Sequence, residues 1–331
     1  MQISVPDTRL ALPTRISIVV PVYRGERSLP ELLGEIEPLS HESVTPAGHR
    51  YVVAEVLLVH DCGPDASDRT IAALAAQFDF VRPIWLTRNF GQHAATLAGM
   101  ASAAGDWIVT VDEDGQQNPA DIAKLLDEAL GLGMQVIYAR PSNEPPHGFV
   151  RNMSSRLAKK IAASMMGSQA STRFNSFRLV DGEIGRSLAA YCSNGVYLDT
   201  ALLWIAGTVG SCAVELRMEA DRPSGYSYRR LVAHFWTLVM TSGTGPLRLI
   251  TVLGFGAVLV AFALAVYAIW VKISGHAEVQ GWTSLVVVVA FFAGCILMSL
   301  GMIAEYLAVT MTIVMGKPLY VVSSKPADRR L

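Results

Sequence analysis

Three adjacent acidic residues, Asp112, Glu113 and Asp114, follow directly after the apolar stretch 109–111. Side chains alternate across the end of a strand, so Asp112 and Asp114 can point in the same direction. A cluster of unpaired negative charge is costly unless a cation or a partner neutralises it. The stretch therefore predicts a bound divalent cation, and an ordinary acidic turn is the alternative interpretation.

The ligands that this stretch offers are oxygen atoms, which favour Mg²⁺ or Mn²⁺. Such an ion keeps several waters and can also hold two phosphate oxygens of a nucleoside diphosphate. Gln116 can add a carbonyl oxygen. The expected cofactor is thus Mg²⁺ or Mn²⁺, and a nucleotide that carries a diphosphate is the expected ligand.

The residues that must position this stretch alternate between strand and helix patterns. Short apolar, β-branched runs predict strands, and apolar residues at helical spacing predict the helices between them. The predicted strands are 16–22, 51–59, 81–86, 107–111 and 134–139, and the predicted helices are 29–37, 69–77, 93–104 and 118–130. Ser67 is expected to cap the second helix. The alternation predicts an α/β domain with a mainly parallel sheet, which binds ligands at the carboxyl ends of its strands.

Two uncharged runs near the end of the sequence, 249–271 and 283–304, predict transmembrane helices. Each is long enough to cross a bilayer core, and Glu305 marks where the second helix is expected to reach the headgroups. The joining loop holds one lysine, whereas several cationic residues flank the pair, so both termini are expected in the cytoplasm. Two buried helices of a soluble core are the alternative.

Two further segments, 151–166 and 226–240, combine basic and apolar residues in the way typical of helices that lie on a membrane surface. Helices packed on the sheet with a solvated basic edge are the alternative. The expected organisation is a catalytic domain over 1–215, an amphipathic segment over 216–245, two transmembrane helices over 246–316 and a cytoplasmic tail over 317–331.

The composition agrees with a membrane location, because 51% of the 331 residues are hydrophobic and 17% are charged. A net charge of -1 without a run of lysines and arginines argues against a nucleic-acid partner. The four cysteines lack the spacing of a zinc site and the density of a disulfide scaffold, so free thiols in a reducing compartment are expected. The N-terminal residues lack the apolar core of a secretory signal.

The sequence resembles the family 2 glycosyltransferases of GT-A fold that act on polyprenyl phosphates. These include dolichol-phosphate mannose synthase, the bactoprenol glucosyltransferases and the undecaprenyl-phosphate aminoarabinose-type transferases. The matching segments, in family order, are IVVPVY from Ile18, VHDCGPD from Val59, RNFGQHAATLAG from Arg88, VDEDGQQNP from Val111, SFRLVD from Ser176, GYS from Gly225 and EYL…GKPLY from Glu305. The run RNFGQH most resembles the aminoarabinose-type branch.

The resemblance implies a nucleotide-sugar donor and a role for several residues of this chain. The residues implied at the nucleotide base and ribose are Pro21, Tyr23 and Asp61, with Asp112 at the ribose or behind the metal. The implied metal ligands are Asp114 and Gln116. His93, at the start of a predicted helix, is expected to be structural or to orient the substrate.

The chain departs from the family pattern at several of these positions. Arg24 and Gly25 stand where the family usually has Asn-Glu, and the run HDCG at 60–63 replaces the usual Asp-Asp-Gly-Ser. Gly115 stands in place of Leu, and Gln117 in place of Asp or Asn. The base preference and the shape of the metal loop therefore stay open.

The implied acceptor, a polyprenyl phosphate, needs no strong general base, because a phosphate monoester with a second pKa of about 6 is mostly dianionic at neutral pH. The resemblance places cationic groups around that phosphate, and arginine suits bidentate contact. The residues concerned are Arg140, Arg151 with Ser155, and Arg178; an ordinary surface or ion-pairing arginine is the alternative for each. The expected reaction is an in-line displacement that inverts the sugar, with the metal stabilising the departing diphosphate.

Two other classes of protein share these features. A polysaccharide synthase also joins a GT-A domain to membrane helices, but it needs more spans to build a channel. A non-catalytic membrane protein that binds nucleotide-sugars is the second alternative. The resemblance further implies a bacterial inner membrane and a homo-oligomer, a tetramer by analogy, while the sugar and the lipid length stay open.

Overall fold

The computed structural model describes residues 12–142, 174–192, 197–215 and 217, scattered positions between 254 and 274, and residues 282–326. The chain divides into two compact units. The first unit comprises Met1–Lys159, Ser168–Gly225 and Pro318–Leu331, and the second comprises Lys160–Gly167 and Tyr226–Lys317. The C-terminal residues therefore belong to the first unit, although the predicted membrane segments precede them.

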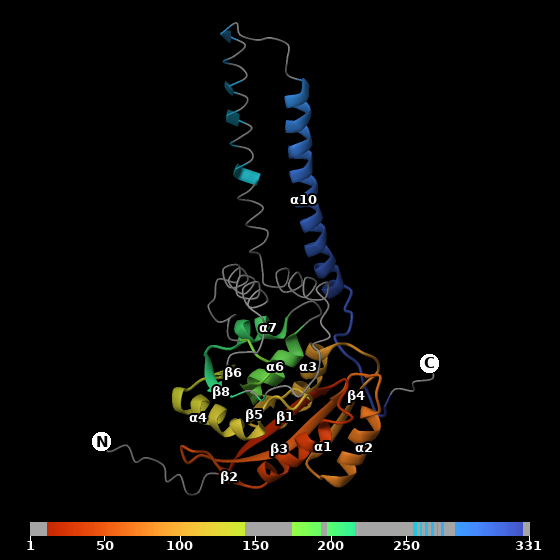
Figure 1. The fold of residues 1–331 in the computed structure, drawn as a ribbon, viewed down its shortest axis with the longest axis vertical. Coiled ribbons are helices and arrows are strands. Elements are labelled where there is room, and N and C mark those ends of the chain that lie inside the picture. The colour runs from red at the N-terminus through yellow and green to blue at the C-terminus, as the bar shows by residue number, and fades with distance from the viewer. Residues whose placement is uncertain are drawn as a thin grey trace, which may run out of the picture. The chain divides into compact units, whose positions relative to one another are not determined.

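In the described residues, the first unit is built on one sheet of nine strands (Figure 1). The strands are β1 (Thr14–Val22), β2 (Ser43–Val44), β3 (Arg50–His60), β4 (Val81–Leu86), β5 (Trp107–Thr110), β6 (Val136–Pro141), β7 (Arg178–Asp181), β8 (Val209–Val214) and β9 (Val322–Ser323). Their order is β8-β6-β7-β5-β1-β3-β4-β9, with β2 paired to β3.

The strand directions confirm the predicted mainly parallel α/β fold. Strand β1 pairs parallel with β3 and β5, β3 pairs parallel with β4, and β6 pairs parallel with β8. Strands β2, β7 and β9 run antiparallel to their neighbours. Because β7 lies antiparallel between β5 and β6, those two strands point the same way.

Helices cover both faces of this sheet (Figure 1). The helices are α1 (Leu29–Ile36), α2 (Ser67–Gln77), α3 (Gln92–Ser102), α4 (Ile122–Leu132), α6 (Gly182–Tyr191) and α7 (Leu198–Ile205), with short 3₁₀ turns η1 (Glu37–Ser40) and η2 (Pro119–Asp121). One core cluster joins β1 to α1, α2 and α4, and the other joins the opposite face to α3, α6 and α7. Strand β1 is buried on both faces, which explains its continuous apolar sequence.

The predicted elements are present, with shifted ends and one wrong cap. Ser67 is the first residue of α2 rather than its cap, which is Ala66. The Ser67 hydroxyl instead donates to Asp65 Oδ1 at 2.6 Å and accepts from the Gly25 amide at 2.8 Å. The predicted helix 118–130 begins as η2 and continues as α4, which ends at Gly133, where φ is 63°.

The second unit contains α10 (Trp282–Val314), a helix of 33 residues. At a rise of about 1.5 Å per residue it is about 50 Å long, more than the roughly 30 Å of a bilayer core. Its window Phe291–Ala308 has a mean hydropathy of 1.7, and among the described residues it is the one helix long and apolar enough to cross a membrane.

The second predicted span, 283–304, lies inside α10, which continues past Glu305 to Val314. The first predicted span, 249–271, lies mostly outside the described residues. The two predicted amphipathic segments, 151–166 and 226–240, lie entirely outside them.

Candidate active site

The loops that follow β1, β3 and β5 meet at one edge of the sheet, because these neighbouring strands are parallel. The residues predicted at the nucleotide, Pro21, Tyr23, Asp61 and Asp112, lie at the ends of these three strands. The Asp61 amide donates to the carbonyl of Val22 at 2.8 Å, which continues the pairing of β1 and β3 beyond the strands. The fold thus brings the predicted donor residues to one edge.

Glu113, the middle residue of the acidic stretch, holds two of these loops together. Its carboxylate accepts hydrogen bonds from the amides of Tyr23 and Arg24, each at 2.8 Å. Burial raises the pKa of Glu113, and the two amides oppose that rise by stabilising the charged form. This carboxylate therefore braces the loop after β1 against the loop after β5, a role that the sequence did not predict.

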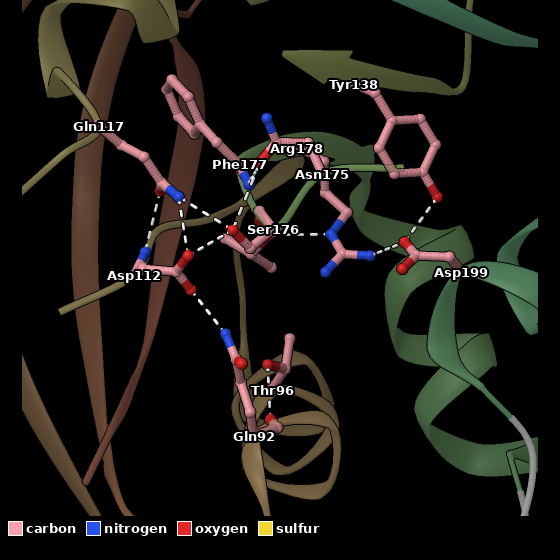
Figure 2. Close-up of polar contacts among 11 residues, drawn as sticks. Gln92, Thr96, Asp112, Gln117, Tyr138, Asn175, Ser176, Phe177, Arg178 and Asp199 are labelled. Atoms are coloured by element: carbon pink, nitrogen blue, oxygen red, sulfur yellow. Dashed lines mark hydrogen bonds and ion pairs between the residues drawn. The ribbon is translucent and has the colours of Figure 1, made fainter. Parts of the chain in front are cut away.

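Asp112 is held by hydrogen bonds from three side chains (Figure 2). Gln92 of α3 donates to its Oδ1 at 2.7 Å, Gln117 donates to its Oδ2 at 2.9 Å, and the Ser176 hydroxyl also donates to Oδ2. Burial and the nearby charge of Asp114 raise the pKa of Asp112, while the bonds from Ser176 and Gln117 lower it. The orientation of this carboxylate is fixed by residues from three separate segments.

Asp114, by contrast, is exposed. Its Oδ1 accepts from the Gln116 amide at 3.1 Å across a turn in which Gly115 has a φ of 75°, a conformation that favours glycine. The Gln116 carbonyl accepts from the Arg217 amide at 3.0 Å. A turn closed in this way presents the Asp114 side chain outward.

The chemistry of these donors fits a divalent ion. The side chains concerned, Asp112, Asp114 and Gln116, offer hard oxygen atoms, and the repulsion that raises the pKa of Asp112 is the kind that a cation relieves. Among the described residues, no group of three or more His, Cys, Asp or Glu could hold a metal. Two carboxylates with waters and substrate phosphates are a usual Mg²⁺ ligand set.

Asp61 fixes the loop that leads into α3. Its side chain is buried, and its two carboxylate oxygens accept from the amides of Phe90 and Gly91 at 2.7 and 2.8 Å. Gly91 has a φ of 92°, which allows the chain to turn into Gln92, whose side chain reaches Asp112. The structure thus shows Asp61 orienting the start of α3, and its contact with a nucleotide stays a prediction.

One departure from the family pattern, Cys62, lies in the run at 60–63. Cys62, at the position where the family usually has glycine, adopts a φ of 51°, the left-handed region that glycine favours. Its Sγ donates to the carbonyl of Leu86 at 3.0 Å. A Cβ on Gly63 would lie 1.5 Å from the carbonyl oxygen of Tyr23, so this close contact between loops requires glycine.

Arg178 lies in a buried ion pair (Figure 2). It stands in register with Thr110 of β5 and Tyr138 of β6, and its guanidinium contacts the carboxylate of Asp199 on α7. Its Nε donates to the Thr110 hydroxyl at 3.1 Å, and the Tyr138 hydroxyl donates to Asp199 at 2.9 Å. Burial lowers the pKa of Arg178, but the Asp199 charge and the interactions with Tyr138 together outweigh this effect and raise it. The guanidinium predicted at the acceptor phosphate is thus engaged inside the protein.

The direction of β7 brings Ser176 to the same edge. Because β7 is antiparallel to β5, its amino end lies beside the carboxyl end of β5. The Thr110 hydroxyl donates to the Ser176 carbonyl, while the Ser176 hydroxyl contacts Asp112. The run SFRLVD pointed to this segment by resemblance alone, and neither its strand nor its contact with the acidic stretch was predicted.

The other residues predicted at the acceptor are placed less completely. Arg140 is exposed near the carboxyl end of β6, which points to the same edge as β5. Arg151 and Ser155 lie outside the described residues.

His93 packs its ring edge-on against Tyr197, with 4.4 Å between ring centroids, and burial with the nearby Asp199 charge raises the pKa of Tyr197 to about 12. The contact is compatible with the structural role expected for His93.

The chain is similar to known proteins over most of its length. The family model described as glycosyl transferase family 2 matches residues 17–184. The undecaprenyl-phosphate 4-deoxy-4-formamido-L-arabinose transferase of Klebsiella pneumoniae (strain 342) is 29% identical over 316 residues, covering 92% of this chain and 92% of the relative. The prophage bactoprenol glucosyl transferase homolog of Escherichia coli (strain K12) is 26% identical over 318 residues, covering 93% and 98%.

A solved structure shares the fold. The crystal structure of mannosyl-3-phosphoglycerate synthase from Rubrobacter xylanophilus matches with a TM-score of 0.50 and 14% identity, covering 69% of this chain and 73% of that chain. At this identity the likeness concerns the fold alone.

Proposed function

The chain belongs to glycosyl transferase family 2, and we propose that it transfers one sugar from a nucleotide-sugar to the phosphate of a polyprenyl lipid. One observation carries this proposal. Each of the two relatives matches over at least 92% of this chain and of its own length. One is named for undecaprenyl phosphate and the other for bactoprenol. A match of this extent includes both the sheet edge with its acidic loop and the long apolar helix.

The donor binds at the edge formed by the loops after β1, β3 and β5. Asp114 and Gln116 would hold Mg²⁺ or Mn²⁺, which would supply positive charge for the diphosphate leaving group. Asp112 keeps a fixed orientation through Gln92, Gln117 and Ser176. Glu113 keeps the loop after β1 in place, so Tyr23 is presented to the nucleotide.

In the transfer, an oxygen of the acceptor phosphate forms a bond to the anomeric carbon of the sugar. The bond from that carbon to the β-phosphate oxygen breaks at the same time, and the nucleoside diphosphate leaves with the electron pair. Attack opposite the leaving group inverts the sugar. Since the acceptor is already mostly dianionic at neutral pH, the protein positions it and offsets its charge, and we assign that work to Arg140, Arg151 and Ser155.

Arg178 has a less direct place in this scheme. Its pairing with Asp199 makes it a link between β7 and α7, next to the strand that carries Ser176. In the proposal, Arg178 contributes by holding this side of the site in shape, and a direct contact with the acceptor phosphate requires exchange of its partner.

The chain connectivity supports two membrane crossings. Strand β8 ends at Val214 and β9 begins at Val322, and both strands belong to the same sheet. A membrane cannot pass between strands of one sheet, so the chain must cross an even number of times between them. If α10 is one crossing, a second lies between 215 and 281, where the uncharged run 249–271 is the candidate.

The finer organisation follows from this topology and from the family resemblance. Residues 1–215 form the catalytic domain, 216–245 a juxtamembrane segment, 246–316 the two crossings, and 317–331 a cytoplasmic tail that adds β9 to the catalytic sheet. The catalytic domain and both termini lie on the cytoplasmic side of a bacterial inner membrane. By the same resemblance the chain assembles as a homo-oligomer, with a tetramer as the expected state.

The test is a transfer assay with detergent-purified protein. Radiolabelled UDP-, GDP- and CMP-sugars are offered with undecaprenyl phosphate, with and without Mn²⁺ or Mg²⁺. We expect metal-dependent label in the lipid, loss of at least about a hundredfold in rate for Asp114→Ala, and no change for the exposed control Asp79→Ala. Nucleotide binding without lipid labelling by any donor would contradict the proposal, and full activity of Asp114→Ala would contradict the metal assignment.

A further inference from the structure

The residues that follow α10 return to the catalytic sheet and complete one of its edges. Strand β9 pairs antiparallel with β4, with Leu86 opposite Val322, and the Thr87 amide donates to the Val321 carbonyl at 3.0 Å. Leu319 and Tyr320 pack against the core cluster on the α3 face of the sheet. We call residues 318–323 the C-terminal strap.

The packing of Leu319 and Tyr320 is what allows so short a strand to form. An isolated pair of short strands is at best marginally stable in water, and it needs an apolar face or packing against a helix. The side chains of Val321 and Val322 are 41% and 51% exposed, whereas Leu319 and Tyr320 are less exposed and pack against the core cluster. The strap is therefore anchored by these two residues and aligned by its backbone.

The strap holds one end of the loop that carries the start of α3. This loop, residues 87–91, begins at Thr87, which is bonded to the strap, and ends at Phe90 and Gly91, which are bonded to Asp61. The guanidinium of Arg88 lies over the Phe90 ring, 4.4 Å from its centroid. Both ends of the loop are fixed, one by the C-terminal strap and the other by Asp61, a predicted donor residue.

The loop passes this restraint to the acidic stretch. The residue directly after it, Gln92, donates to Asp112 Oδ1 at 2.7 Å. A shift of the loop would move Gln92 and release one of the bonds that orient Asp112. The acceptor residue Arg140 lies on β6, and four strands separate β6 from β4 in the sheet, so it has no comparable link to the strap.

We propose that the C-terminal strap is a positioning element of the donor site: through loop 87–91 it sets Gln92 against Asp112, and Leu319 and Tyr320 are its positioning residues. The inference rests on the proposed function, because it concerns binding of the nucleotide-sugar. It assigns to the C-terminal residues an effect on the donor that is separate from membrane anchoring and from acceptor binding.

The experiment compares steady-state kinetics of full-length variants in detergent. The double substitution Leu319→Ala/Tyr320→Ala removes the anchoring side chains, Tyr320→Phe keeps the ring, and Val322→Ala alters an exposed side chain of the same strand. We expect the double variant to raise the KM for the nucleotide-sugar about tenfold, which corresponds to about 1.4 kcal/mol, with the acceptor KM changed less than about twofold. Both controls should match the wild type.

An unchanged donor KM, or an equal rise in both KM values, would overturn the inference, because a general loss of structure affects both substrates. If the double variant does not fold, amide hydrogen exchange on the wild-type protein decides instead. Saturating UDP or GDP with Mn²⁺ should slow exchange in 87–91 and in 319–323 together, and slowing in 87–91 alone would overturn the inference. A wild type that binds nucleotide in this way but labels no lipid would refute the proposed function and leave the strap supported.

Discussion

Replacing Asp199 by Asn should destabilise the catalytic unit strongly. The Arg178 and Asp199 side chains are 5% and 4% exposed, so the neutral amide would leave the guanidinium buried without a counter-charge. Breaking a buried ion pair from one side typically costs about 3–5 kcal/mol. With about 2–4 °C of melting temperature per kcal/mol for a domain of this size, the expected fall in Tm is roughly 6–20 °C.

The double variant Arg178→Met/Asp199→Leu should be less damaging than either single change. It removes both charges and retains apolar volume, but the Tyr138 hydroxyl loses its acceptor on Asp199, and the Thr110 hydroxyl loses its donor on Arg178 while it keeps its bond to the Ser176 carbonyl. Each such loss costs about 1–3 kcal/mol. Because the double variant should cost less than either single change, the coupling energy, taken as the sum of the two single costs minus the cost of the double variant, should exceed about 3 kcal/mol.

The measurement is thermal unfolding by circular dichroism in detergent. It compares Asp199→Asn and the four proteins of the cycle, which are the wild type, Arg178→Met, Asp199→Leu and the double variant, with Asp79→Asn as an exposed control. A Tm of Asp199→Asn within about 2 °C of the wild type would refute the reasoning, because the pair would then contribute nothing. The double variant also tests Arg178 at the acceptor. If it folds and keeps the wild-type acceptor KM, Arg178 does not bind the acceptor phosphate; a selective rise in that KM would indicate that it does.

Three further predictions concern other parts of the chain. Gly63→Ala should lower the affinity for the donor and should lower the free energy of unfolding by several kcal/mol, because its Cβ would collide with the Tyr23 carbonyl. A wild-type Tm would contradict this. Although burial raises the pKa of Glu55, bonds from Ser17 and Ala104 and the charge of Arg82 bring it below the usual 4.5. Its stabilisation is therefore present above the unfolded pKa and lost as the pH falls through the lower folded pKa, so Glu55→Gln should flatten the decline of Tm between about pH 5 and pH 3, and parallel curves would contradict this. The protein should remain in the pellet after alkaline carbonate extraction and be released by detergent, and release by carbonate alone would refute membrane crossing.

The parallel strands were predictable because burial on both faces leaves a sequence signal that is local. Strand β3, for example, is apolar from Tyr51 to Val59 except for Glu55, and the polar residues His60 and Asp61 follow. Strands β7 and β9 are four and two residues long, and what makes them strands is pairing with distant partners. No periodicity within such short segments specifies that pairing.

The acidic stretch was predictable as a site, but the distinct roles of its residues were not. The sequence alone separates Asp112 and Asp114 from Glu113 only by the alternation of side chains at a strand end, and it predicts no role for Glu113. Their roles diverge because the amides of Tyr23 and Arg24 approach Glu113, while Gln92 and Ser176 reach Asp112. Those partners come from segments distant in sequence, so only the sheet order decides which carboxylate stays exposed.

The reversal of β7 bears on the residues predicted at the acceptor. Strand β6 ends at Pro141 at the active-site edge, and antiparallel β7 begins at Arg178 at the same edge. The described residues before and after the segment with Arg151 and Ser155 therefore both lie at that edge, as two tethers. Had β7 run parallel, one tether would lie at the opposite edge, about 13 Å away for a strand of four residues.

The same reasoning applies to the chain that leaves for the second unit. Strand β8 is parallel to β6, and the Ser142 amide donates to the Val214 carbonyl at 2.9 Å, so both chains depart from neighbouring positions. The described chain therefore leaves β6 and β8 at the edge that holds Asp112, ahead of the segments 151–166 and 226–240 that are predicted to lie on the membrane surface. An enzyme that joins a soluble nucleotide-sugar to a lipid phosphate must bring its membrane contacts to the edge where the donor binds. The strand directions place the described ends of β6 and β8 and the start of β7 at that edge, and a sheet with β7 and β8 reversed would not.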